Sequence, residues 1–326
     1  MTRKHPKSLR NKHQTVRVRS KIGDTMQPEL KHILSFKTAL AAGTIRAAAD
    51  QLGLEPSTVS RNIASLEKQL ATVLIGRGRK GVMPTEAGLL LLDSAQRQSG
   101  EMEALRSQLD ALENMERGAV SVALGEGFVS DFSQSVLAKF SRDHPEITFS
   151  LNVGSTDQMT DAIVEDRAHI GLAFDVAPNA RLNVVAHADR HLVVICKQGG
   201  QFDSSDKVKI SEFADLPCAF LSKGYGVGAV IADMEASHGF RARAVMETGS
   251  IAALKAFVRG DLGVTLLPEF VVADDIKAGT LRARDVAVSN FGRGKVSLFV
   301  RQDRRLPLAA QKLIPAMARS LLALNQ

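Results

Sequence analysis

The chain has 326 residues, of which 44% are hydrophobic and 24% charged, and it carries a net charge of +7. This length exceeds the needs of one ordinary hydrophobic core, so we expect at least two packed domains in a globular protein. No apolar run is long enough for a membrane helix or a secretory signal. The sequence therefore argues against disordered, fibrous, membrane and secreted proteins, and it predicts a cytoplasmic protein with no membrane partner.

The positive charge is concentrated at the N-terminal end of the chain. Residues 1–25 carry a net charge of +7 and residues 26–85 carry +4, which leaves −4 for the remainder. A basic front on a mildly acidic body predicts that the front binds a polyanion. Residues 1–25 lack apolar periodicity, so we predict a disordered basic arm that either contacts phosphates or has no role. Met26, just before the first helical pattern, is an alternative translation start.

Cys196 and Cys218 are the two cysteines, and neither belongs to a CxxC motif or a Cys/His cluster. This pattern argues against a disulfide framework and a structural zinc site, and we expect no metal and no cofactor. Both side chains are expected to be buried small hydrophobes, with a redox-sensing pair as the alternative.

Three short helices are predicted before residue 71. Apolar residues at helical spacing run from Glu29 to Gly43, Thr44 caps a second helix over residues 45–52, and Pro56 opens a third. Gly53 gives the tight turn between the second and third helices, which is typical of a helix-turn-helix.

One face of the third helix is polar near its N-terminal end. In a helix-turn-helix this end meets base edges and phosphates in the major groove, although a merely solvated face would show the same pattern. The helix residues that we predict to contact DNA are Thr44, Ser57, Thr58, Ser60, Arg61 and Asn62.

A β-wing is predicted directly after the third helix. Residues 73–75 and 82–83 are strand-like runs that flank a basic, Gly-rich tip. Arg77, Arg79 and Lys80 in this tip are expected to reach the DNA backbone or a minor groove. The tip does not fit a phosphate-binding loop of nucleotide enzymes, because no GxxxxGK[ST] or GxGxxG motif is present there.

A long helix is predicted from Thr85, its cap, to about residue 117. Apolar residues follow a 3.5-residue repeat along it, which favours a seam between two helices and therefore a dimer. Packing against the protein's own body is the alternative. The residues that we assign to the dimer seam are Met102, Leu105, Leu109 and Leu112.

From Gly118 onward, strand and helix patterns alternate. Strands are expected at residues 120–124, 147–153, 170–174, 192–196, 217–221, 243–247, 264–267 and 296–300, with helices between them, including 133–142 and 156–166. Such alternation implies parallel sheet with helical crossovers, and its extent predicts two α/β lobes. A ligand is expected beyond the carboxyl ends of the strands.

Together these segments resemble the LysR-type transcriptional regulators from Met26 onward. The resemblance is carried by AAADQLGLEPSTVSRNIASLEKQL and LIGRGRKGVMPTEAG, and further along by FSRDHPEITFSLNVGS and IAALKAFVRGDLGVTLLP. It implies a winged helix-turn-helix over 26–85, a dimerisation helix over 86–117 and a two-lobed effector-binding domain over 118–326, similar to type 2 periplasmic binding proteins. Lobe I would comprise about 118–180 and 294–326, and lobe II about 181–293.

The resemblance also implies a regulator whose binding to double-stranded promoter DNA changes when a small coinducer enters the cleft between the lobes. This coinducer is expected to be an anion. It implies a homodimer that further assembles into a tetramer, with RNA polymerase as a candidate partner. A ligand-independent DNA-binding protein is the alternative. The coinducer contacts, carried over by position, would be Glu126, Phe128, Ser155, Thr156, Tyr225, Thr248 and Thr265. Ser155 and Thr156 could instead cap a helix, and Phe128 or Tyr225 could be core residues.

The chain departs from the family pattern at the recognition helix. Pro56 and Ser57 stand where the family usually has Gln followed by Pro or Ser, so an amide that could recognise adenine is missing. Ala71 replaces a usual Gly and Ile75 a usual Phe, and we expect both changes to preserve the packing.

Three other functional classes fit parts of the sequence. A two-lobed enzyme could use histidines for acid/base chemistry, but none of them lies in a catalytic motif. These histidines are His144, His169, His187, His191 and His238. A solute-binding protein of a transport system would need a secretion signal and would lack the DNA-binding front. A chromatin-type protein would bind all DNA sequences alike. We therefore expect a transcriptional regulator and not an enzyme.

Overall fold

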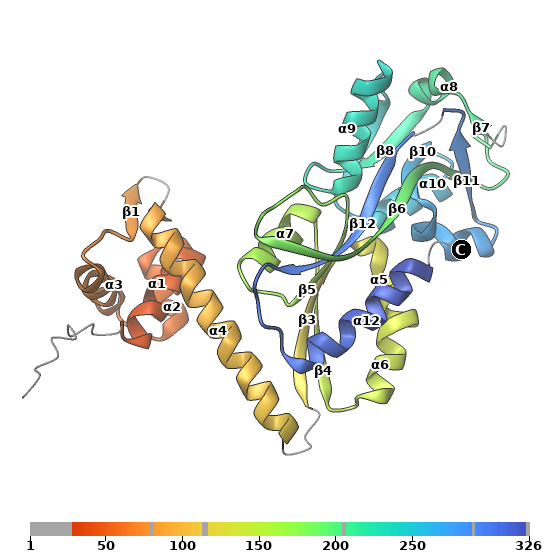
Figure 1. The fold of residues 1–326 in the computed structure, drawn as a ribbon. Coiled ribbons are helices and arrows are strands. Elements are labelled where there is room, and N and C mark those ends of the chain that lie inside the picture. Colours follow the sequence, from red (N-terminus) through yellow and green to blue (C-terminus); the bar gives the residue numbers. More distant parts are fainter. Residues whose placement is uncertain (1–27, 79–80, 113–116, 204–206, 289–290, 324–326) are drawn as a thin grey trace, which may run out of the picture. The chain divides into compact units, whose positions relative to one another are not determined.

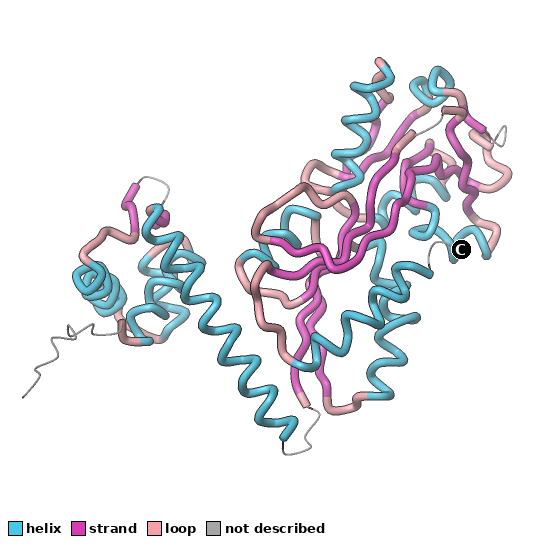
Figure 2. The backbone as a smooth tube through the Cα atoms, viewed as in Figure 1, coloured by secondary structure: helices cyan, strands magenta, loops and turns pink. Residues whose placement is uncertain are grey.

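The computed structural model describes residues 28–78, 81–112, 117–203, 207–288 and 291–323, with Arg77 described by its backbone alone. The chain divides into two units, Met1–Ala95 and Gln96–Gln326. Figure 1 shows the helices and strands of each unit, and Figure 2 separates them by type. The predicted basic arm, residues 1–25, lies outside the described residues.

The first unit contains the three helices that local sequence signals predict. They are α1 (Leu30–Ala42), α2 (Ile45–Leu52) and α3 (Pro56–Leu70). Gly43 ends α1 in a left-handed conformation at φ 73°, and the Thr44 hydroxyl caps α2 by accepting a 3.1 Å hydrogen bond from the Ala47 amide. Gly53, also left-handed, closes α2 before the turn into α3. The helix-turn-helix prediction is confirmed.

The wing packs onto these helices through backbone contacts. Strands β1 (Ile75–Gly78) and β2 (Gly81–Pro84) form an antiparallel pair. The Glu67 carboxylate of α3 accepts hydrogen bonds from the Leu74 and Ile75 amides at 2.8 and 3.3 Å, so α3 and the wing are fixed together. The shared core is apolar and fully enclosed, and its largest members are Phe36, Ile63, Leu66 and Leu74.

Helix α4 (Glu86–Leu112) follows the wing, and its first turn is capped by the Thr85 hydroxyl, which accepts a 3.1 Å hydrogen bond from the Gly88 amide. Its residues up to Ala95 belong to the first unit and those from Gln96 to the second. The predicted continuation of this helix toward residue 117 falls on residues 113–116, outside the described residues.

The second unit is a two-lobed α/β domain. In lobe I, strands β3 (Gly118–Leu124), β4 (Ile147–Val153) and β5 (Ile170–Phe174) are parallel. In lobe II, strands β8 (Pro217–Leu221), β9 (Arg243–Thr248) and β10 (Val264–Pro268) are parallel. Two long strands, β6 (Leu182–Lys197) and β12 (Arg293–Arg301), pair antiparallel and run through both lobes (Figure 1). This architecture confirms the predicted fold class.

Two details of the sheet correct the sequence-based expectation. The pattern predicts parallel sheet throughout, whereas β12 is antiparallel to β5 and β6 is antiparallel to β10. The crossover strand β6 is also much longer than the predicted run at 192–196, because only that run is continuously apolar and buried, whereas the first half of the strand is mostly exposed. Two further strands, β7 (Lys207–Val208) and β11 (Leu281–Val286), have no counterpart in the prediction.

The helices of the second unit divide between the two lobes. Lobe I has the short helices η1 (Glu126–Phe128), α5 (Val129–Asp131), η2 (Phe132–Leu137) and α6 (Ala138–Asp143), and also α7 (Thr156–Val164) and α12 (Leu308–Ala323). Lobe II has α8 (Ile210–Asp215), α9 (Gly226–His238), α10 (Ile251–Arg259), η3 (Glu269–Val272) and α11 (Ala273–Lys277). The predicted helix at 133–142 is therefore split, since its first half forms a π-helical turn.

Among the described residues, no helix is both long enough and apolar enough to cross a membrane.

Candidate DNA interface and effector cleft

The N-terminal end of α3 presents short polar side chains around one long cation. Ser57 and Arg61 are exposed, while Thr58 and Ser60 are half-buried. The Arg61 guanidinium lies along its own helix, because Nε donates to the Ser57 carbonyl at 3.3 Å and Nη2 to the Thr58 hydroxyl at 3.4 Å. These contacts are surface contacts on one helix turn, so the guanidinium can exchange them for a phosphate or a base edge.

Asn62 lies at the inner edge of this face. Its side-chain amide donates a 2.9 Å hydrogen bond to the hydroxyl of Ser35, a buried residue of α1. This hydrogen bond ties α3 to α1, and a DNA contact by Asn62 stays a prediction. Thr44 caps α2 as an acceptor, and its hydroxyl retains a proton that it can donate.

The side chain of Arg77 and the whole of Arg79 and Lys80 lie outside the described residues. Strands β1 and β2 do form the hairpin that the sequence predicts around this tip. A DNA contact by these three residues stays a prediction.

The predicted dimer seam on α4 is an exposed apolar stripe. Met102, Leu105, Leu109 and Leu112 are 52%, 46%, 53% and 80% exposed. Other α4 residues contact lobe I, where Glu103 pairs with Arg304 at 2.8 Å and the Ser107 hydroxyl accepts from the Leu308 amide at 3.0 Å. Packing on the protein's own body and an apolar stripe therefore coexist on different faces of one helix.

The two lobes meet closely in one part of the cleft. A cavity of about 40 Å³ is left there, which has room for about one water molecule. A larger pocket of about 630 Å³ lies next to it, and its walls include residues of α7 in lobe I and of α9 in lobe II. Phe128 of lobe I stacks on Phe270 of lobe II with ring centroids 5.1 Å apart. A Cβ on Gly127 would lie 3.0 and 3.1 Å from the side chains of Val271 and Ile251 in lobe II, so the lobes meet closely here.

Glu126 bridges the lobes at the edge of this cavity. Its carboxylate accepts hydrogen bonds from the amides of Ile251 and Ala252 at 2.8 and 3.1 Å, and from the Ser250 hydroxyl at 3.4 Å. Those donors form the N-terminus of α10, whose partial positive charge favours a carboxylate. Ser250 was not among the predicted site residues, although its place before an apolar helical run is a recognisable N-cap signal.

Ser155 and Thr156 serve the protein's own backbone. Ser155 and Gln158 form a capping box at the start of α7. The Thr156 hydroxyl, 8% exposed, donates to the Phe174 carbonyl and accepts a 2.8 Å hydrogen bond from the Gly226 amide of lobe II. In this arrangement the Ser155 hydroxyl caps a helix and the Thr156 hydroxyl joins the lobes, and ligand contacts by these two residues stay a prediction.

The other expected coinducer contacts divide in a similar way. Thr265 is 1% exposed inside lobe II and its hydroxyl donates to the Ala219 carbonyl at 2.7 Å, and a ligand contact there stays a prediction. The Thr248 hydroxyl accepts from the Ser250 amide, and the Tyr225 hydroxyl donates to the Gly249 carbonyl at 2.8 Å. Phe128 and Tyr225 do line the small cavity.

The sequence and structure of this chain can now be compared with known proteins. The LysR substrate binding domain matches residues 113–321, and the helix-turn-helix of the lysR family of bacterial regulatory proteins matches residues 30–89. The chain belongs to the LysR family of transcriptional regulators.

Individual LysR proteins resemble this chain over most of its length. The regulator YeiE of Escherichia coli K12 is 26% identical, over 78% of this chain and 86% of its own. The crystal structure of CbnR in complex with its target DNA has a TM-score of 0.53 at 18% identity, covering 90% of this chain and 99% of CbnR. The Synechocystis CcmR regulatory domain in complex with 2-PG has a TM-score of 0.56 at 19% identity, covering 62% and 97%.

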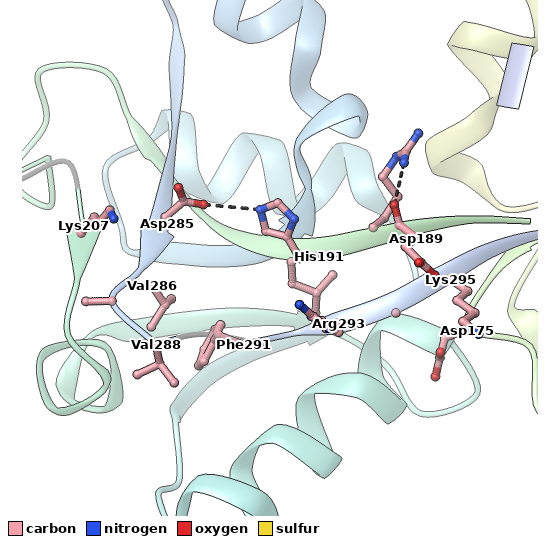
Figure 3. A pocket seen from close by; sticks show the side chains of 14 residues that line it. Asp175, Asp189, His191, Lys207, Asp285, Val286, Val288, Phe291, Arg293 and Lys295 are labelled. Atoms are coloured by element: carbon pink, nitrogen blue, oxygen red, sulfur yellow. Dashed lines mark hydrogen bonds and ion pairs between the residues drawn. The ribbon is translucent and has the colours of Figure 1, made fainter. Parts of the chain in front are cut away.

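The widest pocket described for this LysR regulator is lined in part by the two crossover strands, β6 and β12 (Figure 3). It measures about 1180 Å³, and its walls include Arg293 and Lys295 of β12, which lie opposite His191 and Asp189 of β6. His191 also pairs with Asp285 at 3.4 Å, and both side chains are exposed. Carboxylates and cations alternate around this pocket, so it offers no strongly charged surface to a single class of ligand.

The two cysteines of the regulator are buried in lobe II. Burial raises the pKa of the Cys218 thiol to about 12 and also raises the pKa of Cys196. Strand β10 lies between β6, which carries Cys196, and β8, which carries Cys218. Since the thiolate is the reactive form, this environment supports the expectation of buried hydrophobes over a redox-sensing pair.

Proposed function

We propose that this regulator binds promoter DNA through the exposed end of α3 and acts as a homodimer whose DNA binding responds to a small organic anion. The observation that carries the DNA-binding part is the exposed polar face around Arg61, on a helix held rigidly by its buried side. CbnR, which shares the fold, has been solved on its target DNA. Because promoter DNA is the proposed binding partner, the protein would act in the cytoplasm.

The test is a gel-shift titration of the operator with the Arg61→Ala variant. Loss of a guanidinium that contacts a base or phosphate should weaken operator binding by about tenfold to a hundredfold. Lys68→Ala is the matched control, since Lys68 is an exposed cation in the last turn of the same helix. Equal binding by wild type and Arg61→Ala would contradict the proposed interface.

The homodimer is supported by the apolar stripe on α4. Four large apolar side chains at heptad spacing on an exposed helix face are costly to leave in water, and a second copy of the same helix would cover them. Assembly of dimers into a tetramer and contact with RNA polymerase are extensions of this proposal.

The coinducer response is supported by the two-lobed domain with its crossover strands β6 and β12. The N-terminal ends of two helices, α7 and α10, line the small cavity between the lobes, and such helix ends favour anions. The CcmR domain of the same fold was solved with 2-PG. We would screen small carboxylates by thermal shift and then measure the promoter-reporter response to each hit. A screen without hits, together with an unregulated reporter, would favour the ligand-independent alternative.

An enzymatic role gains no support from the histidines. His169 is held by the Ser121 amide at Nδ1 and by Glu103 at Nε2, and His238 bonds the Met234 carbonyl of its own helix. These are structural contacts, so we propose a regulator without catalytic activity or cofactor.

A further inference from the structure

The Glu126 carboxylate lies at the place where the two lobes meet. Glu126 belongs to lobe I and follows β3 directly, whereas its three hydrogen-bond donors belong to lobe II. The two sides of this contact are 124 to 126 residues apart in sequence. The carboxylate therefore acts as an anion supplied by the protein itself at the N-terminus of α10.

We propose that Glu126 is a latch that holds the two lobes together. This proposal rests on the coinducer response proposed above and names the interlobe contact on which such a response would act. At the latch the lobes leave a cavity of only about 40 Å³, whereas a neighbouring pocket of about 630 Å³, lined by α7 and α9, does not include Glu126. Opening of the latch would let the lobes move apart.

Among the described residues, other hydrogen bonds also join the facing sides of the two lobes. The Thr156 hydroxyl accepts from the Gly226 amide at 2.8 Å, the Asp157 amide donates to the Gly224 carbonyl at 3.1 Å, and Ser130 donates to Asp274 at 3.4 Å. The first two are contacts between neutral groups, and the third is a single long one. Glu126 is the strongest of these links because an ionised acceptor receives three donors, two of them at a helix N-terminus.

The latch makes a prediction that a direct ligand contact would not make. If Glu126 binds the effector, removing its charge weakens effector binding. If Glu126 holds the lobes together, removing its charge raises the population of the open form even without an effector. Loss of hydrogen bonds to an ionised group should shift the balance between closed and open forms by about 10- to 100-fold.

The experiment needs no effector and uses the full chain. We would measure amide hydrogen exchange in wild type, Glu126→Gln and Glu126→Ala, with Glu146→Gln, an exposed carboxylate, as the charge control. The informative amides are those of Asp157 and Gly226, which cross the cleft away from Glu126. The latch predicts that they exchange about 10- to 100-fold faster in both Glu126 variants and as in wild type in the control.

A second measurement uses the single tyrosine, since the chain has no Trp and its one Tyr is Tyr225, beside the cavity. Acrylamide should quench Tyr225 fluorescence more strongly in Glu126→Gln than in wild type. Gly226→Ala gives the open reference, because the new Cβ would lie 1.8 Å from the Phe174 carbonyl of lobe I. Gly228→Ala is its control, as the nearest atoms there are 3.5 Å away.

The outcomes separate the latch from simpler roles. Faster exchange confined to Ile251 and Ala252 would make Glu126 a helix cap and overturn the latch, as would wild-type quenching in Glu126→Gln alongside strong quenching in Gly226→Ala. Because these readouts involve neither effector nor DNA, a regulator without any coinducer response would still show them. Failure of the latch and failure of the proposed function are therefore distinguishable.

Discussion

The first turns of α3 and α7 carry similar side chains in different surroundings. Ser57 and Thr58 of α3 lie at the surface, where the nearest cation, Arg61, belongs to the same helix. Ser155 and Thr156, at the start of α7, are engaged by Gln158 and by the Gly226 amide of the other lobe. Hydroxyls at a helix N-terminus are therefore open to solvent in one region and form an internal joint in the other, and the residues packed against them decide which.

In the proposed homodimer two copies present the proposed DNA-binding face at a fixed spacing, so the largest expected effect is at α4. Leu105→Asp places a carboxylate in the apolar stripe that a partner would cover, which should break the dimer. Operator affinity should then fall by about 100-fold or more, because a single half-site contact remains. Light scattering and gel shift measure the two effects, with the exposed Gln108→Asp as control. A dimer that persists in Leu105→Asp would place the interface elsewhere.

The contrast between α3 and α7 explains how far the sequence alone could lead. Gly43, Thr44, Gly53 and Pro56 act on their own or adjacent residues, so the caps and turns of the helix-turn-helix follow from local chemistry. The interlobe contacts do not, because Thr156 meets Gly226 across 70 residues of sequence. A hydroxyl pattern predicts a donor or acceptor, but it cannot specify the distant partner.

Glu126 shows the same limit in another form. Its position after a strand correctly places it at the mouth of the cleft, and the family resemblance implies a ligand contact there. The structure instead brings the N-terminus of α10 onto its carboxylate. The exposed first half of β6 and the antiparallel pairing of β12 were equally hidden, because strand partners depend on the whole sheet rather than on one segment.

The second prediction exchanges a hydroxyl for a methyl group in each of the two contrasted regions. Thr156→Val leaves the buried Gly226 amide without its acceptor, which should lower the free energy of unfolding by about 1–3 kcal/mol. Thr58→Val changes a half-buried surface residue and should lower it by less than about 0.5 kcal/mol. Urea unfolding of both variants gives the comparison. Equal losses would show that the two helix ends do not differ as the structure indicates.

The third prediction is an acid sensitivity specific to lobe II. Asp275 of α11 is buried and pairs with Lys255, at 2.9 Å, and Arg259 of α10. Burial alone would raise the pKa of Asp275, but the hydrogen bonds and charges of these two cations outweigh it, and the net effect lowers the pKa. Stability from this group is therefore present above the unfolded-state pKa of about 4 and is lost as the pH falls through the lower folded-state pKa.

Asp275→Asn removes this contribution and should lower the free energy of unfolding at pH 7 by about 1–2 kcal/mol, since two cations lose a buried partner. The difference from wild type should shrink as the pH is lowered below about 4. Thermal unfolding at several pH values measures it. A difference that stays constant down to acidic pH would mean that the ion pairs do not contribute to stability.

The smallest expected effect is a gain in stability at the end of the recognition helix. Ala71 caps the C-terminus of α3 in the left-handed conformation, at φ 50°, where the family usually has Gly. Its side chain is exposed, so the substitution preserves the packing, as expected, but it strains the backbone, because a Cβ is unfavourable in this conformation.

Ala71→Gly relieves the strain but also gives the unfolded chain more freedom, and the two effects oppose each other. We expect a net stabilisation of about 0.5 kcal/mol in the DNA-binding unit, with operator affinity unchanged, measured by calorimetry of the full chain. Gly53→Ala, which places a Cβ at another left-handed cap of the same unit, should show the opposite sign. A loss of stability in Ala71→Gly would show that the left-handed cap costs this helix less than the added freedom of the unfolded chain.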